Sequence, residues 1–208
     1  MNTSFAIPVH NEHEELDRLI GHILKYKNPE DEIVIQCDQG NTTPEVYKVL
    51  SNYEGQVKII EFPLNLDFAS FKNNLKENCT GDWIFQIDAD EYPDDYLISL
   101  LPSILKQNPT IEVFWVPRIN LVDGLTTEHI NKWRWNVNEK GWVNFPDYQG
   151  RIYRNDKSIY WKNPVHEVVV GAKKVSHFPT EEQFCLYHSK DIERQEKQNK
   201  LYSEIQTQ

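Results

Sequence analysis

The sequence of 208 residues predicts an α/β fold, in which a mostly parallel sheet flanked by helices precedes a mixed β C-terminal half. Short apolar runs alternate with longer segments of helical spacing along the first 110 residues. Connections of this kind form right-handed crossovers, which place helices on both faces of a parallel sheet. From Ile111 onward strand-like runs replace this alternation, so the second half is expected to be mixed.

Four apolar runs are predicted as strands in the first half: SFAIPV (4–9), EIVIQC (32–37), VKIIEF (57–62) and DWIFQI (82–87). Each is followed by apolar residues at helical spacing, which predict four helices. They cover about 16–24, 44–53, 68–79 and 94–105. Pro93, Asp94 and Asp95 favour the start of the last helix, because carboxylates stabilise a helix N-terminus.

In the second half, VFWVPRINLV (113–122) and VHEVVVG (165–171) are predicted as strands. Between them, residues 123–150 form a long segment without clear periodicity, and such segments are typically functional or mobile. Five aromatic residues lie in it: Trp133, Trp135, Trp142, Phe145 and Tyr148. Their rings suit the apolar face of a sugar, and their place in a long loop suits a binding site or lid, whereas a minor core or an oligomer contact explains them equally well.

The composition restricts the possible partners. With 22 Lys and Arg against 32 Asp and Glu, the net charge is −10, which argues against a nucleic-acid or anionic-membrane surface. No run approaches the roughly 20 apolar residues of a membrane span. The three cysteines are odd in number and widely spaced, so neither a disulfide framework nor a zinc site is indicated and reducing cytoplasm is expected.

Polar clusters follow three of the predicted strands. They are HNE (10–12), DQGN (38–41) and DAD (88–90). Open α/β sheets bind ligands beyond the carboxyl ends of their strands, so these clusters predict a site at one sheet edge. Each cluster alone is also explained by helix caps and turns.

The DAD cluster suits a divalent cation. In an extended segment Asp88 and Asp90 point the same way, and small Ala89 between them allows a ligand to approach closely. Mg²⁺ or Mn²⁺ takes one or two carboxylates together with substrate phosphate oxygens. The expected cofactor is therefore Mn²⁺ or Mg²⁺, bound with a nucleotide diphosphate.

Five motifs, taken in order, resemble the family 2 glycosyltransferases of the GT-A fold. They are PVHNEHEELDRLIGHIL, IVIQCDQGNT, FKNNL, TGDWIFQIDADE and NPVHEVVV. The resemblance covers roughly residues 4–188 and implies a nucleotide-diphosphate sugar as donor, with UDP as the most usual nucleotide. It also implies an inverting outcome, whereas the acceptor stays unknown.

The resemblance also implies roles in nucleotide binding. Pro8 and His10 correspond to residues that line the base, and Glu12 closes that motif, although His10 replaces a more usual Tyr. Asp38 corresponds to the carboxylate that accepts a hydrogen bond from the base, which suits the N–H of uracil. Lys72 is expected to reach the nucleotide, with a solvated helix lysine as the alternative.

Three residues are implied as metal-site residues. Asp90 is the principal ligand, and Asp88 faces the ribose or the metal. His188, in CLYHS, corresponds to a late histidine that serves as a further metal ligand in many GT-A enzymes. A histidine in this position is also explained by an ordinary hydrogen bond.

Inverting transfer requires a base that deprotonates the acceptor hydroxyl. Glu167 is the candidate, because it shares one strand face with valines, where an apolar setting would raise its pKa. The alternative is a structural ion pair with, for instance, Arg151 or Arg154. Asp147 and Asp123 are the substitutes for the base.

The expected organisation is one GT-A domain over 1–208. Residues 1–110 bind the nucleotide sugar, 111–190 form the acceptor half, and 191–208 form a C-terminal helix or tail. Two other enzymatic readings stay open, a DxD phosphatase and a nucleotidyltransferase, although no GxxxxGK phosphate loop is present. A non-catalytic sugar-nucleotide-binding module is the third alternative.

Overall fold

The computed structural model describes residues 1–206, and side chains are described for 1–197, 199 and 200. The helices in this part are α1 (His13–Tyr26), α2 (Pro44–Ser51), α3 (Phe68–Glu77), α4 (Asp95–Gln107), α5 (Thr127–Trp133) and α6 (Ile192–Gln206), with a short 3-10 helix η1 (Glu182–Phe184). The strands are β1 (Thr3–Val9), β2 (Glu32–Asp38), β3 (Lys58–Phe62), β4 (Trp83–Gln86), β5 (Glu91–Pro93), β6 (Val113–Asp123), β7 (Val143–Arg154), β8 (Tyr160–Lys162), β9 (Val168–Val170), β10 (Val175–His177) and β11 (Leu186–Asp191).

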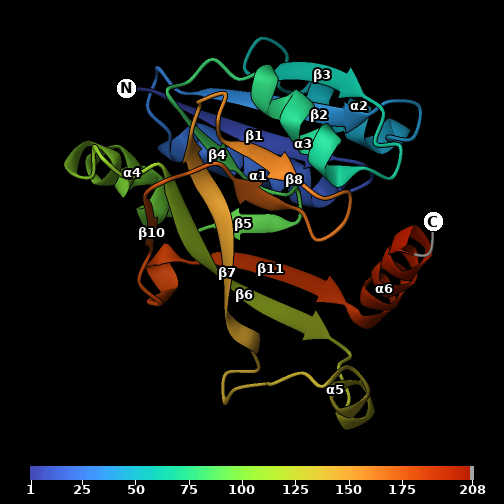
Figure 1. The fold of residues 1–208 in the computed structure, drawn as a ribbon. Coiled ribbons are helices and arrows are strands. Elements are labelled where there is room, and N and C mark those ends of the chain that lie inside the picture. Colours follow the sequence, from blue (N-terminus) through green and yellow to red (C-terminus); the bar gives the residue numbers. More distant parts are fainter. Residues whose placement is uncertain (207–208) are drawn as a thin grey trace.

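Nine strands of the described chain form one sheet, in the order β3-β2-β1-β4-β7-β6-β11-β5, and β10 also pairs with β6. The first four strands pair in parallel, which confirms the predicted α/β arrangement. β7 runs antiparallel to both β4 and β6, and β5 runs antiparallel to β11, so the second half is mixed as expected. β8 and β9 form a separate two-stranded sheet (Figure 1).

Each face of the parallel half carries its own core, because successive strand residues point to opposite faces. Phe5 and Ile7 of β1 pack in one cluster with buried residues of α1, α2 and α4. Ala6, between them, belongs to a second cluster, which includes Leu75 of α3 and Trp161 of β8. The sheet is therefore covered on both faces, as the crossover rule predicts.

The segment 123–150 differs from the sequence prediction. Instead of one irregular stretch it contains α5 and the first residues of β7, which pairs with β6 across two register shifts. The interrupted ladder explains why no regular alternation marks β7 in the sequence. Trp142 packs with Ile119 and Cys185 in a small cluster, with Phe145 against it, so these two rings form a minor core.

The strand predicted over 165–171 is also shorter than expected. β9 contains only Val168–Val170, and residues 164–166 form a bend in which His166 has a φ of 52°. Glu167 therefore precedes the strand instead of lying on one of its faces. The start predicted for α4 is confirmed, because Asp94 caps the helix by accepting the backbone N–H of Tyr96 at 2.9 Å.

Candidate active site

A cavity of about 440 Å³ lies where β1, β2 and β4 end, at the carboxyl edge of the parallel strands. All residues predicted to bind the donor line it: Pro8, His10, Glu12, Asp38, Lys72, Asp88, Ala89 and Asp90. Glu167 joins them from the second half of the chain. The three polar clusters thus meet at one edge, as the strand order requires.

The loop after β1 and the end of β2 form one side of the cavity. Asp38 is 4% exposed, and its Oδ1 accepts the backbone N–H of Leu64 at 2.9 Å. Its Oδ2 lies 3.6 Å from Nδ1 of His10. Glu12 accepts the backbone N–H groups of His10 and Asn11 at 2.9 and 3.0 Å, so its carboxylate shapes the loop that carries His10.

Lys72 is 3% exposed, so the alternative of a solvated helix lysine is wrong. Its Nζ lies 2.7 Å from Oε1 of Glu167 and 3.1 Å from Oδ1 of Asp88. The same Nζ lies over the ring of Trp161, 4.7 Å from the ring centre. Burial lowers the pKa of Lys72, but the charges of Asp88 and Glu167 outweigh it and raise the pKa above its usual value. The ammonium therefore links the DAD turn to the Glu167 bend.

Glu167 has an ionic setting instead of the apolar one that its flanking valines indicated. Its ion-pair partner is Lys72, not Arg151 or Arg154. The side chain lies on the boundary between the first cavity and a second one, because it lines both.

Asp88 and Asp90 have different partners. The chain turns after β4, where the N–H of Glu91 donates to the carbonyl of Asp88 at 2.8 Å, so the segment is not the extended one assumed from the sequence. Asp88 accepts from Arg151 at 2.6 Å. Burial opposes its ionisation, but Arg151 and Lys72 hold the pKa of Asp88 well below its usual range.

Asp90 faces the C-terminal part of the chain. Its Oδ2 lies 3.2 Å from Nε2 of His188 and 3.3 Å from a guanidinium nitrogen of Arg194. Burial raises its pKa, but the hydrogen bond and charge of His188 dominate and lower the pKa of Asp90 to about 2.

The hydrogen bonds around His188 define its tautomer. Nδ2 of Asn120 donates to Asp147 at 2.9 Å, so Oδ1 of Asn120 is an acceptor for the Nδ1–H of His188 at 2.8 Å. Nε2 then faces Asp90 with either a proton or a lone pair. A lone pair there would repel the carboxylate unless a cation lies between them.

A network of charged side chains, formed by Glu91, Arg118, Arg151 and Asp147, supports this edge of the site. Glu91 is 1% exposed and accepts from Arg118 at 2.9 Å and from Arg151 at 2.6 Å, while its second oxygen accepts the N–H of Asp88 at 3.1 Å. Arg118 also donates to Asp147 at 2.7 Å. The two guanidinium groups are therefore fixed between carboxylates.

The second cavity, of about 450 Å³, lies across Asp88 and Asp90 from the first. Trp115, Tyr148 and Trp161 line it together with polar side chains. Asp147 also lines it, but this substitute base already accepts hydrogen bonds from Arg118, Asn120 and Gln149. The other substitute, Asp123, lies apart from both cavities, at the end of β6.

The sequence profile described as glycosyl transferase family 2 matches residues 4–169. The chain belongs to glycosyltransferase family 2. No curated protein matches this family 2 chain by sequence.

Solved structures of S. aureus TarS resemble the family 2 chain in fold. TarS 1-349 is 14% identical with a TM-score of 0.64, and the match covers 91% of this chain and 60% of TarS 1-349. The same TarS segment in complex with UDP-GlcNAc is 16% identical with a TM-score of 0.63, and covers 91% and 59%. Its complex with UDP is 14% identical with a TM-score of 0.64, and covers 99% and 65%. The chain thus spans less than two thirds of these relatives, and the likeness supports the GT-A fold.

The donor atoms at this family 2 site fit a metal only in part. No three His, Cys, Asp or Glu side chains within the described residues converge as a metal site. One oxygen of Asp90 and one nitrogen of His188 lie 3.2 Å apart, whereas Asp88 is bound by Lys72 and Arg151. Two protein ligands suit Mg²⁺ or Mn²⁺ when substrate oxygens complete the coordination.

Sequence reasoning missed several charged residues of this family 2 site. Arg118 interrupts an apolar strand run, and Lys190 shares the strand face of His188, so both carried a recognisable signal. Arg194 lies in a polar C-terminal segment and carried none. Among the described helices, none combines the length and apolar character needed to cross a bilayer.

Proposed function

We propose that the chain transfers a sugar from a nucleotide-diphosphate donor to a hydroxyl or glycan acceptor, with inversion. The observation that carries this proposal is the convergence of Asp38, Lys72 and the DAD turn on one cavity of a family 2 chain. Cavity volume and position both suit a nucleotide at the carboxyl edge of the sheet.

A uridine nucleotide fits the base end of the cavity. Asp38 presents a carboxylate oxygen beside His10, and a carboxylate accepts the N–H of a pyrimidine imide. The fold is also shared with TarS, whose structures were solved with UDP-GlcNAc and with UDP.

Asp90 and His188 would hold Mn²⁺ or Mg²⁺ together with diphosphate oxygens. The ion, when bound, stabilises the negative charge of the departing nucleoside diphosphate. Asn120 assists by fixing the ring of His188 so that Nε2 points at Asp90. Asp88, held by Lys72 and Arg151, is available to the ribose side of the cavity.

Glu167 takes the proton of the acceptor hydroxyl. It lies on the boundary of the two cavities, which is where an acceptor in the second cavity meets a donor in the first. Lys72, 2.7 Å away, keeps the carboxylate oriented at that boundary. The aromatic rings of Trp115, Tyr148 and Trp161 in the second cavity suit the apolar face of a sugar acceptor.

The test is the release of nucleoside diphosphate from a panel of UDP-, GDP-, ADP- and TDP-sugars, in Mn²⁺ and in EDTA. We expect release from at least one donor, and loss of release in EDTA and in Asp90→Ala. Asp94→Ala is the matched control, because this nearby carboxylate caps α4, and it should retain release. Release of inorganic phosphate would instead indicate a phosphatase, and release of pyrophosphate a nucleotidyltransferase. Binding of a donor without turnover would indicate a binding module, and absence of binding would refute the proposal.

A further inference from the structure

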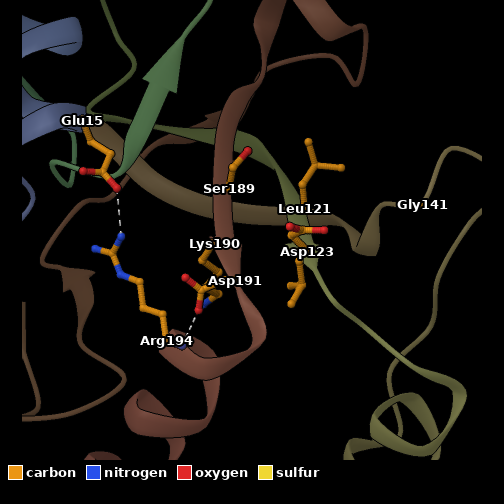
Figure 2. A pocket seen from close by; sticks show the side chains of 9 residues that line it. Glu15, Leu121, Asp123, Gly141, Ser189, Lys190, Asp191 and Arg194 are labelled. Carbon is orange, nitrogen blue, oxygen red and sulfur yellow. Dashed lines mark hydrogen bonds and ion pairs between the residues drawn. The ribbon is translucent and has the colours of Figure 1, made fainter.

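Arg194 lies in the first turn of α6 and reaches back to the candidate site. Its guanidinium contacts three carboxylates: Glu12 at 2.9 Å, Glu15 at 3.2 Å and Asp90 at 3.3 Å. Figure 2 shows the side chain extending from α6 toward Glu15. Its backbone N–H donates to Oδ1 of Asp191 at 2.7 Å, which ties the first turn of α6 to the end of β11.

Arg194 separates two cavities. One is the donor cavity described above, and the other, of about 530 Å³, lies beside Leu121, Asp123 and Ser189 (Figure 2). Arg194 lines both cavities, as does Lys190. The side chain of Arg194 is 31% exposed.

Charged side chains near its start connect α6 to the rest of the chain: Arg194 contacts Glu12, and Glu196 lies 3.9 Å from His129 of α5. The sequence of this helix, IERQEKQNKLYSEIQ, is mostly polar. Figure 1 shows α6 beside the sheet instead of packed across a face of it. Arg194 also contacts both Glu12, which shapes the loop beside the base, and Asp90 of the DAD turn.

The charges around the cavity show what Arg194 can bind. Lys72 is enclosed by Asp88 and Glu167, and Arg118 and Arg151 are fixed by Glu91. Arg194 lines the cavity together with Lys190 and Lys197, and its side chain is more exposed than those of Lys72, Arg118 and Arg151. A guanidinium forms bidentate hydrogen bonds with phosphate as readily as with carboxylate.

We infer that Arg194 binds the diphosphate of the donor, so that α6 contributes a side chain to the nucleotide cavity. In the structure Glu12, Glu15 and Asp90 hold the guanidinium at the edge of the donor cavity. If Asp90 held a cation, it would bind Arg194 less strongly, and N–H groups of Arg194 would be available to the phosphate oxygens. This inference rests on the proposed function, and it adds the C-terminal helix to the donor site.

The test compares the binding of a nucleoside diphosphate with that of its monophosphate by calorimetry, in EDTA and in Mn²⁺. The probe is the tightest-binding of UDP, GDP, ADP and TDP, with the matching monophosphate. Arg194→Gln should weaken diphosphate binding by about tenfold or more, because charge-assisted hydrogen bonds are lost. Monophosphate binding should change by less than about threefold, and Arg194→Lys should give an intermediate loss of diphosphate binding.

Arg18→Gln is the matched control, since Arg18 is an exposed arginine on α1, and it should bind both ligands as the wild type does. Thermal unfolding of each variant identifies any general loss of structure. Equal weakening of mono- and diphosphate by Arg194→Gln, or unchanged binding of both, would overturn the inference while the proposed function stands. If the wild type binds none of these nucleotides, the proposed function itself fails, and this inference fails with it.

Discussion

Replacement of Glu91 by Gln tests whether the network of charged side chains around Glu91 stabilises the site. Glu91 is 1% exposed and accepts two hydrogen bonds from guanidinium groups, at 2.9 Å from Arg118 and 2.6 Å from Arg151. Both arginines donate to Oε1, and a glutamine carbonyl oxygen can take that place, but it carries no negative charge. The NH₂ group then faces the backbone N–H of Asp88, from which it cannot accept a hydrogen bond. Hydrogen bonds to charged groups contribute about 1.5–3 kcal/mol each, so two of them amount to about 3–6 kcal/mol.

The lower end of this range is expected for Glu91→Gln. Arg151 keeps its contact with Asp88, and Arg118 keeps its contact with Asp147, so neither guanidinium is left alone. A loss of about 3 kcal/mol agrees with the cost of breaking a buried ion pair. For a chain of this length it lowers the melting temperature by roughly 6–12 °C.

Thermal unfolding followed by circular dichroism measures this change, with Asp94→Ala as control. Asp94 caps α4, so its loss should cost only about 1 kcal/mol. Nucleotide binding provides a second measurement, because Glu91 also holds the backbone N–H of Asp88. A fall in melting temperature no larger than that of Asp94→Ala, together with unchanged nucleotide binding, would refute the role given to Glu91.

Three further substitutions address other contacts of the structure. Lys72→Met removes the ammonium between Asp88 and Glu167 and should cost about 3–5 kcal/mol in urea unfolding; an unchanged midpoint would contradict this pairing. Glu32 is partly buried, which raises its pKa, but hydrogen bonds from Ser4 and Thr80 outweigh burial and lower the pKa below its usual 4.5. Its stabilising effect is therefore present above pH 4.5 and lost as pH falls further, so urea midpoints of wild type and Glu32→Gln should converge in acid and differ at pH 7. In Gly81→Ala the new Cβ would lie 2.7 Å from the backbone nitrogen of Ser4, which should cost about 1–3 kcal/mol in the same assay, whereas unchanged stability would show that the backbones separate freely.

Local patterns predicted the parallel half of the fold well. Apolar runs and helical spacing specify β1, β2, β4 and their helices, because the buried faces of these elements repeat at fixed intervals along the chain. The same approach failed for β7, whose pairing with β6 is interrupted by register shifts. It also overextended β9, since the bend at His166 leaves the preceding residues outside the strand.

The candidate site was predictable to the extent that its residues follow strands. Asp38, Asp88 and Asp90 converge because parallel strands end at one edge, a rule that needs only the order of elements. The contacts between distant residues were not predictable in this way. His188 meets Asp90 across 98 positions of sequence, and Arg151 meets Glu91 across 60.

The sequence by itself determined the family, the α/β alternation and the placement of three polar clusters at the sheet edge. The tertiary structure decided how each charge is used: Lys72 joins Asp88 to Glu167, Glu91 fixes two arginines, and Arg194 reaches Asp90 from α6. The physical reason is that periodicity records which face of an element is buried. Ion pairs depend on the distance between side chains, which is defined only once the strands have paired.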